Sequence, residues 1–234
     1  MRLALGLVAF VLVGWGAGAL WISIVGSDEE ELVRALAEQR TPALTAIART
    51  VTWAGSLWLL VPLALACCVL LVRAGLPRQA AAVALSLAGA CLISDLVKVL
   101  VGRPRPSVEH LQTVAGASFP SGHSIQAGAF WFSLVLAIRA AGVAPVRVRR
   151  AAALAALIVL AVALSRVYLG VHYPSDVIAG VLLGIGWAVY VAAWCGFYSH
   201  DERGAAKSTR RAKSVALLLC EQGLQNFKAL VERQ

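Results

Sequence analysis

The stretch from Lys98 to Asp176 holds three polar clusters in an otherwise apolar sequence. They read Lys98-Val-Leu-Val-Gly-Arg-Pro-Arg-Pro106, Phe119-Pro-Ser-Gly-His-Ser124 and Ser165-Arg-Val-Tyr-Leu-Gly-Val-His-Tyr-Pro-Ser-Asp176. Together they contain cations, a glycine turn, two histidines and a carboxylate. Such groups are costly in an apolar chain and usually mark a functional site. We therefore expect the rest of the chain to bring these clusters together at one membrane face.

The composition is that of an integral membrane protein. Hydrophobic residues make up 60% of the 234 residues and charged residues only 14%, which departs from soluble averages in both directions. The net charge of +9 raises the question of nucleic-acid binding. However, the basic residues lie in short segments between apolar runs rather than on one face or helix. This distribution indicates orientation in a membrane and argues against a nucleic-acid partner.

Six apolar runs predict six membrane-spanning helices, because each approaches the length that crosses about 30 Å of hydrocarbon. They cover residues 3–25, 57–72, 80–101, 124–138, 152–169 and 177–197. The first run also resembles a signal peptide, but its hydrophobicity continues past a candidate cleavage site at Ala17-Gly-Ala19, which favours an uncleaved helix. The predicted fold class is all-α, a polytopic six-helix bundle. In the last span, Gly180 and Gly184 predict close helix packing.

Residues 27–54 differ from the spans that flank them. After an acidic start, four apolar residues recur at roughly helical spacing: Leu32, Leu36, Leu44 and Ile47. This pattern predicts an additional amphipathic segment on the membrane surface or over the bundle, with Ser27 or Asp28 as its N-cap. A solvated connecting helix is the alternative. At the other end of the chain we expect a basic cytoplasmic tail at 199–234 with a candidate amphipathic helix, separate from a membrane domain at 1–198.

The distribution of lysine and arginine predicts the orientation. With six spans, the N-terminus, the turns at 73–78 and 139–150 and the tail share one side, which holds most of the basic residues. The positive-inside rule places that side in the cytoplasm. All three polar clusters then fall at the outer face.

Three cations in these clusters predict an anionic ligand. Taken singly, Lys98 could reach the interface from a helix end and Arg105 could be a solvated turn residue. Arg166 is harder to explain in this way, since it lies near the outer end of a span. Three cations at one interface, with few acids beside them, suit an anion, and arginine forks match phosphate oxygens in particular.

The other two clusters supply groups that could act on a phosphate. Ser121-Gly122-His123 begins a predicted helix, whose N-terminal N–H groups form an anion site that glycine lets a ligand approach; Ser121 as an ordinary N-cap is the alternative. His172 and Asp176 lie four residues apart at the start of the last helix. A carboxylate that holds one imidazole nitrogen leaves the other free as nucleophile or base. The alternative is a first-turn carboxylate beside an interfacial histidine.

No acidic cluster suited to Mg²⁺ accompanies these residues, so they predict phosphoryl transfer without a metal. Their order and spacing resemble the type 2 phosphatidic acid phosphatase family, whose site is shared with vanadium haloperoxidases. The family pattern is Lys-x6-Arg-Pro, then Pro-Ser-Gly-His, then Ser-Arg-x5-His-x3-Asp, and every position is present here in order. Arg103 offers a competing register, and the family spacing selects Arg105. The tail beyond about residue 200 lies outside the resemblance.

The resemblance implies a role for each matching residue. His172 would attack phosphorus and form a phosphohistidine, with Asp176 orienting it. His123 would protonate the leaving oxygen and then activate water. No metal or other cofactor would be required, and five groups would hold the phosphoryl oxygens: Lys98, Arg105, Ser121, Gly122 and Arg166.

The predicted function is hydrolysis of a lipid phosphate or diphosphate in the cell (inner) membrane. Undecaprenyl diphosphate is favoured, because an outward-facing site suits a carrier lipid released at that face; phosphatidylglycerol phosphate and phosphatidate are alternatives. A transporter or lipid-binding protein could use the cations for binding alone, but both histidines and Asp176 argue against it. A haloperoxidase is disfavoured, since those chains are soluble. The sequence leaves the oligomeric state open.

Overall fold

The computed structural model describes residues 1–197, which form seven α-helices and one short 3-10 helix, η1. Within this range no strand occurs, and the predicted all-α class is confirmed. The predicted basic tail and its amphipathic helix lie outside the described residues, and the domain boundary at 198 stays a prediction. The elements in chain order are α1 (Arg2–Glu38), α2 (Pro42–Val51), η1 (Thr52–Gly55), α3 (Leu57–Arg73), α4 (Pro77–Val101), α5 (Gly122–Ala140), α6 (Pro145–Tyr168) and α7 (Pro174–Trp194).

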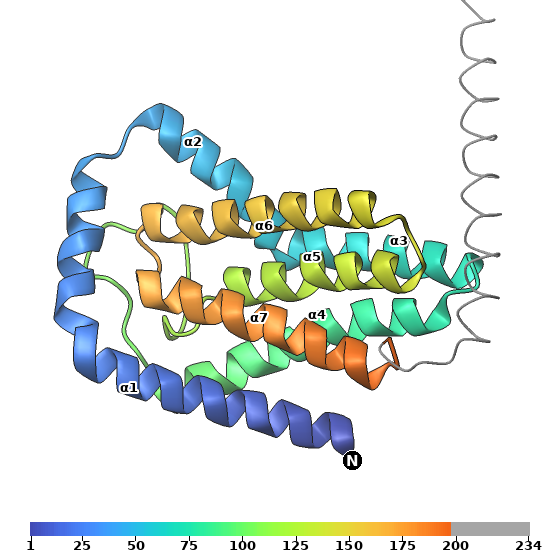
Figure 1. The fold of residues 1–234 in the computed structure, drawn as a ribbon. Coiled ribbons are helices and arrows are strands. Elements are labelled where there is room, and N and C mark those ends of the chain that lie inside the picture. The colour runs from blue at the N-terminus through green and yellow to red at the C-terminus, as the bar shows by residue number, and fades with distance from the viewer. Residues whose placement is uncertain (198–234) are drawn as a thin grey trace, which may run out of the picture.

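Helix α5 lies at the centre of the bundle and packs against α4, α6 and α7 (Figure 1). The predicted small-residue pair, Gly180 and Gly184, lets α7 approach α5 closely. A Cβ on Gly180 of α7 would lie 2.8 Å from the carbonyl oxygen of Ser121, and one on Gly184 would collide with that of Ile125. Close packing through these glycines is therefore confirmed, and it holds the first turn of α5 against the first half of α7.

Four described helices are long and apolar enough to cross a membrane: the Arg2–Ile24 part of α1, α4, α6 and α7. A further candidate is α2 and η1 taken together with α3, bent by 42°. Helix α5 is not among them, since its first turns carry polar side chains such as His123 and Gln126. Because other helices surround α5, it does not need an apolar surface toward lipid. The structure supports four or five spans, and a count of six stays a prediction.

The predicted helix start at Ser27 or Asp28 is wrong. Helix α1 continues from Arg2 to Glu38, because Asp28 and the glutamates after it are compatible with a helix and no proline intervenes before Pro42. Its first part runs alongside α4 and α7, and its second part crosses one end of the bundle (Figure 1). The separate helix here is α2, capped by Thr41, whose Oγ1 accepts from the Leu44 N–H at 3.3 Å. Its position on the membrane surface stays a prediction.

The basic turns and the polar clusters lie at opposite ends of the bundle, as the sequence predicts. The N-terminus and the turns that join α3 to α4 and α5 to α6 lie at one end (Figure 1). The loops at 102–121 and 169–173 lie at the other, under the second part of α1 (Figure 1). All three polar clusters therefore meet at one end of the molecule.

Candidate active site

His172 and Asp176 form the centre of the site. His172 lies in the loop between α6 and α7 and is only 2% exposed, and Asp176 lies in the first turn of α7. Asp176 Oδ2 approaches Nδ1 of His172 to 3.5 Å, as the four-residue spacing predicts. The same oxygen accepts from the Tyr173 N–H at 2.9 Å and from the Ser118 hydroxyl at 2.5 Å. The carboxylate is thus held firmly on the Nδ1 side of the imidazole.

Arg105 occupies the other side of the ring. Its Nη1 lies 3.4 Å from Nε2 of His172 and donates to the Val171 carbonyl at 2.7 Å. The rest of the guanidinium donates to carbonyl oxygens of residues 115–117. A guanidinium has no acceptor, so its contact with Nε2 is a hydrogen bond only when that nitrogen carries a lone pair. This arrangement favours the tautomer with a proton on Nδ1, facing Asp176.

The electrostatic surroundings keep His172 neutral. Burial lowers the pKa of His172 to about 4; the charges of Arg166 and Arg105 also lower it, whereas Asp176 raises it. At neutral pH Nε2 of the imidazole therefore carries a lone pair rather than a proton, which is the form that acts as a nucleophile or base.

Arg166 is buried at 1% exposure near the end of α6. Its Nη1 donates to Thr52 Oγ1 at 2.9 Å and to Gln112 Oε1, so η1 and the 102–121 loop both hold it in place. Its Nε is also buried, and no partner for it occurs within residues 1–197. Buried donors are nearly always paired, so an unpaired guanidinium N–H marks a place where an anionic group fits.

Lys98 lies beside the N-terminus of α5. A Cβ built on Gly122 would be 3.4 Å from Lys98 Nζ and 3.6 Å from the buried Ser94 hydroxyl. Ser121 occupies the N-cap position, but its side chain makes no capping hydrogen bond; its hydroxyl accepts from Ser124 at 3.0 Å. The N-cap alternative for the Ser121 side chain is therefore wrong, and glycine leaves the first turn of α5 open to a ligand.

His123 lies one residue further along α5, half-buried. It is within electrostatic range of Arg166, His172, Lys98 and Arg105. A Cβ on Gly55 of η1 would be 2.8 Å from the His123 carbonyl oxygen, so this glycine lets η1 pack against the helix there. The structure thus brings together every residue that the sequence places in the site.

Sequence reasoning missed several residues that support this site. Ser118 contacts Asp176, Thr52 and Gln112 hold Arg166, and Arg103 donates to Asp176 Oδ1 at 2.8 Å. Only Arg103 carried a signal, since it stands in the Arg-Pro-Arg-Pro motif beside Arg105. Within residues 1–197, no group of three or more His, Cys, Asp or Glu side chains could hold a metal ion. Metal-independent chemistry stays a prediction.

The geometry agrees with a known family. Residues 79–199 match the model of the PAP2 superfamily, and this segment is more than half of the chain. The chain belongs to the PAP2 superfamily. The resemblance to type 2 phosphatidic acid phosphatases is therefore confirmed, and the match includes all eight predicted site residues.

Several PAP2 relatives are phosphatases named for lipid substrates. Lipid A 1-phosphatase of Rhizobium etli is 37% identical over 119 residues, which cover 45% of this chain and 47% of the relative. Decaprenylphosphoryl-5-phosphoribose phosphatase of Mycobacterium tuberculosis is 40% identical over 96 residues, 39% of this chain and 48% of the relative. The chain thus aligns with about half the length of these two relatives.

A third relative is similar over a greater length. Phosphatidylglycerophosphatase B of Bacillus subtilis is 27% identical over 175 residues, or 72% of this chain and 84% of the relative. A crystal structure of the transmembrane PAP2-type phosphatidylglycerolphosphate phosphatase from Bacillus subtilis superposes with a TM-score of 0.68 at 26% identity. The superposition covers 86% of this chain and 100% of the Bacillus subtilis chain. The PAP2 chain described here is therefore a membrane protein with the fold of a solved membrane phosphatase.

Proposed function

We propose that this chain is a membrane phosphatase that hydrolyses a lipid phosphate or diphosphate through a phosphohistidine on His172. The observation that carries the proposal is the way the ring of His172 is held. Asp176 lies on its Nδ1 side at 3.5 Å, and Arg105 lies on its Nε2 side at 3.4 Å. A neutral imidazole fixed between a carboxylate and a phosphate-binding cation is arranged for in-line attack on phosphorus.

In the first step, Nε2 of His172 uses its lone pair to form a bond to phosphorus, and the bond from phosphorus to the leaving oxygen breaks. The Nδ1 proton stays on the ring, where Asp176 stabilises the positive charge that develops. Burial and the charge of Arg166 lower the pKa of His123 to about 3, so His123 is neutral at pH 7 in the free site. The negative charge of the bound phosphate raises this pKa, and His123 then gives its proton to the leaving oxygen. Lys98, Arg105, Arg166 and the N-terminal turn of α5 hold the charged phosphoryl oxygens, with Arg166 Nε as a donor that such an oxygen would satisfy.

In the second step, His123, now neutral, accepts a proton from water. The water oxygen bonds to phosphorus while the phosphorus–Nε2 bond breaks, and its electron pair returns to His172. Inorganic phosphate leaves, and both histidines recover their starting protonation. No atom or electron pair is left over, so the cycle needs only the lipid and water.

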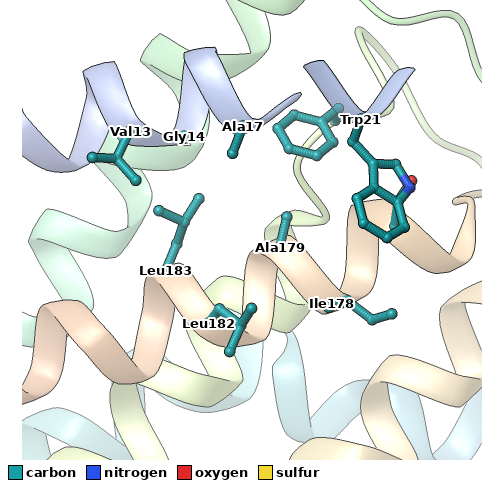
Figure 2. Close-up of a pocket in the computed structure, with 10 residues that line it drawn as sticks. Val13, Gly14, Ala17, Trp21, Ile178, Ala179, Leu182 and Leu183 are labelled. Atoms are coloured by element: carbon teal, nitrogen blue, oxygen red, sulfur yellow. The ribbon is translucent and has the colours of Figure 1, made fainter. Parts of the chain in front are cut away.

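Apolar surface beside the site suits a lipid as the carrier of the phosphate. A pocket of about 240 Å³ opens between α1 and α7, with Val13, Ala17 and Trp21 facing Ile178, Ala179 and Leu182 (Figure 2). Phe119 and Ser175 also line it, and these residues are neighbours in sequence of Pro120 and Asp176. We propose that this pocket takes part of a hydrocarbon chain whose phosphate reaches His172.

The candidate lipids are undecaprenyl diphosphate, phosphatidylglycerol phosphate and phosphatidate. The relatives are named for different lipid phosphates, so they do not favour one substrate, and the preference for undecaprenyl diphosphate stays a prediction. We further propose a multi-pass protein of the cell (inner) membrane with both termini in the cytoplasm and the site facing outward. The basic turns at the end of the bundle opposite the site support this orientation.

Phosphate release by the detergent-purified protein in the presence of EDTA tests the proposal. The assay compares undecaprenyl diphosphate, phosphatidylglycerol phosphate and phosphatidate, with His172→Ala as the inactive variant. EDTA-resistant release that His172→Ala abolishes would support the reaction class and rank the lipids. Lipid binding without release from any of them would leave the other candidate, a non-catalytic lipid-phosphate binding protein or transporter that uses the same cations.

A further inference from the structure

A buried ionic network lies behind Asp176, on the side away from His172. Arg103 donates from Nη1 to Asp176 Oδ1 and from Nη2 to Glu29 Oε2, each at 2.8 Å. All three side chains are nearly inaccessible: 4% exposed for Arg103, 8% for Glu29 and 0% for Asp176. The guanidinium also lies over the ring of Tyr173, with Cζ 3.8 Å from the ring centroid.

Glu29 belongs to the second part of α1, far from the site in sequence. Its Oε1 accepts from the Ser175 N–H and its Oε2 from the Ser175 hydroxyl, both at 2.7 Å. The next residue, Glu30, accepts from the Tyr173 hydroxyl at 2.6 Å and from the Ser107 N–H at 2.9 Å. The second part of α1 is therefore bonded directly to the first turn of α7, which carries Asp176.

We propose that Glu29 is a positioning residue for the reaction and that it acts through Arg103 on Asp176. The proposal rests on the proposed function, in which Asp176 orients His172. The two oxygens of Asp176 have separate tasks: Oδ1 meets Arg103, and Oδ2 meets His172, Ser118 and the Tyr173 N–H. Keeping those tasks separate requires that Arg103 engage only one oxygen.

Glu29 supplies the reason that Arg103 does so. A guanidinium facing a single buried carboxylate tends to bind both of its oxygens in a fork. Here the second arm of the fork is taken by Glu29, so Oδ2 stays directed at Nδ1 of His172. Two carboxylates and one guanidinium also leave the group with one net negative charge. That charge stabilises the positive charge that develops on His172 when Nε2 bonds to phosphorus.

Burial of charges is costly unless each one is paired. When the Glu29 charge is removed, the freed arm of Arg103 has no solvent to turn to, and Asp176 is the remaining carboxylate beside it. Without the Glu29 charge, both arms of Arg103 turn to Asp176 and draw Oδ2 away from His172. The second part of α1 is then not merely a cover over the site. It sets the geometry of the pair that performs the reaction.

The test compares Glu29→Gln with the same change at a neighbouring position of the helix, Glu31→Gln. Glu31 is exposed on α1 two residues after Glu29, and the change removes the same charge. We expect Glu29→Gln to lower kcat about tenfold to hundredfold with little change in KM, the range for groups that orient a reacting imidazole. Glu31→Gln should match the wild type. In an Asp176→Asn background, Glu29→Gln should add almost nothing, because its effect passes through Asp176.

A kcat unchanged by Glu29→Gln, or lowered equally in the Asp176→Asn background, would overturn the proposal. A measurement that needs no turnover distinguishes failure of this proposal from failure of the proposed function. It is the ¹⁵N NMR shifts of the His172 ring at neutral pH. We expect a single tautomer protonated on Nδ1 in the wild type and in Glu31→Gln, and a mixture of tautomers in Glu29→Gln. An unchanged tautomer in Glu29→Gln would reject the positioning role even if no lipid is hydrolysed.

Discussion

Nη1 of Arg105 lies 3.4 Å from Nε2 of His172, on the side of the ring away from Asp176. The backbone carbonyls that it also contacts fix its direction, so the guanidinium cannot turn to solvent without losing several hydrogen bonds. A phosphoryl group at Nε2 would therefore lie next to Arg105. In the proposed reaction this cation also binds the phosphate, and its charge lowers the pKa of His172.

This relationship predicts the pH dependence of the reaction. The neutral ring is the reactive form, and a pKa lowered to about 4 keeps it neutral well below the ordinary histidine range. We expect the acidic limb of kcat/KM that belongs to His172 to lie near pH 4 to 5, so acidification to pH 6 leaves the nucleophile intact. Arg105→Gln removes a charge that lowers the pKa of His172. The pKa should therefore rise, and the acidic limb of kcat/KM in this variant should move to higher pH.

The measurement is kcat/KM from about pH 4 to pH 8, corrected for the known ionisation of the substrate phosphate. Arg149→Gln is the charge-matched control and should leave the limb in place, because Arg149 is exposed near the start of α6, at the end of the bundle opposite the site (Figure 1). A limb near the unperturbed value of about 6.5 in both the wild type and Arg105→Gln would contradict the arrangement around His172.

The contact between α5 and α7 predicts the effect of one added methyl group. Gly184→Ala places a Cβ against the Ile125 carbonyl, so the helices must separate and the first turn of α5 shifts away from Asp176. We expect a loss of about 1–3 kcal/mol in stability together with lower activity. Gly16→Ala is the matched control, since its Cβ would meet nothing within 4 Å. Thermal unfolding in detergent would show the difference, and equal stability of both variants would contradict the packing.

The apolar pocket between α1 and α7 predicts a chain-length effect. Ala179→Phe fills this pocket, so we expect a higher KM for a long-chain lipid phosphate but not for a water-soluble phosphate ester. Leu157→Phe, on the exposed surface of α6, should change neither value. Kinetics with the two substrates would measure this. An equal rise in KM for both substrates would place the hydrocarbon chain elsewhere.

The sequence predicts much of the site because local rules govern it. The four-residue spacing of His172 and Asp176 at a helix start predicts that Asp176 reaches back to His172, and Gly180 and Gly184 predict close packing of the last helix against a neighbour. Alternating apolar spans and loops bring the polar clusters to one end of the bundle. None of these steps requires knowledge of how distant segments pack.

The contacts that the sequence does not predict depend on tertiary packing. Two arginines stand two residues apart, and only the fold shows that Arg105 faces Nε2 of His172 while Arg103 faces the carboxylates of Asp176 and Glu29. The continuation of α1 through the acidic segment also escaped prediction, because Ser27 and Asp28 are good capping residues that here lie within a helix. The predicted count of six spans also depends on packing, since the surrounded helix α5 has no need of a uniformly apolar surface and is not among the candidate spans of the structure.

The most direct test of the account is the detection of phosphate covalently bound to His172. A lipid diphosphate labelled on its terminal phosphate suits the experiment, because its leaving group is itself a phosphate and needs little protonation. His123→Ala should form the phosphohistidine and hydrolyse it slowly, by about 10²- to 10⁴-fold, so that acid-labile label accumulates on the protein. His172→Ala should carry no label. Label that persists in His172→Ala, or turnover without any labelled protein in His123→Ala, would contradict a phosphohistidine mechanism.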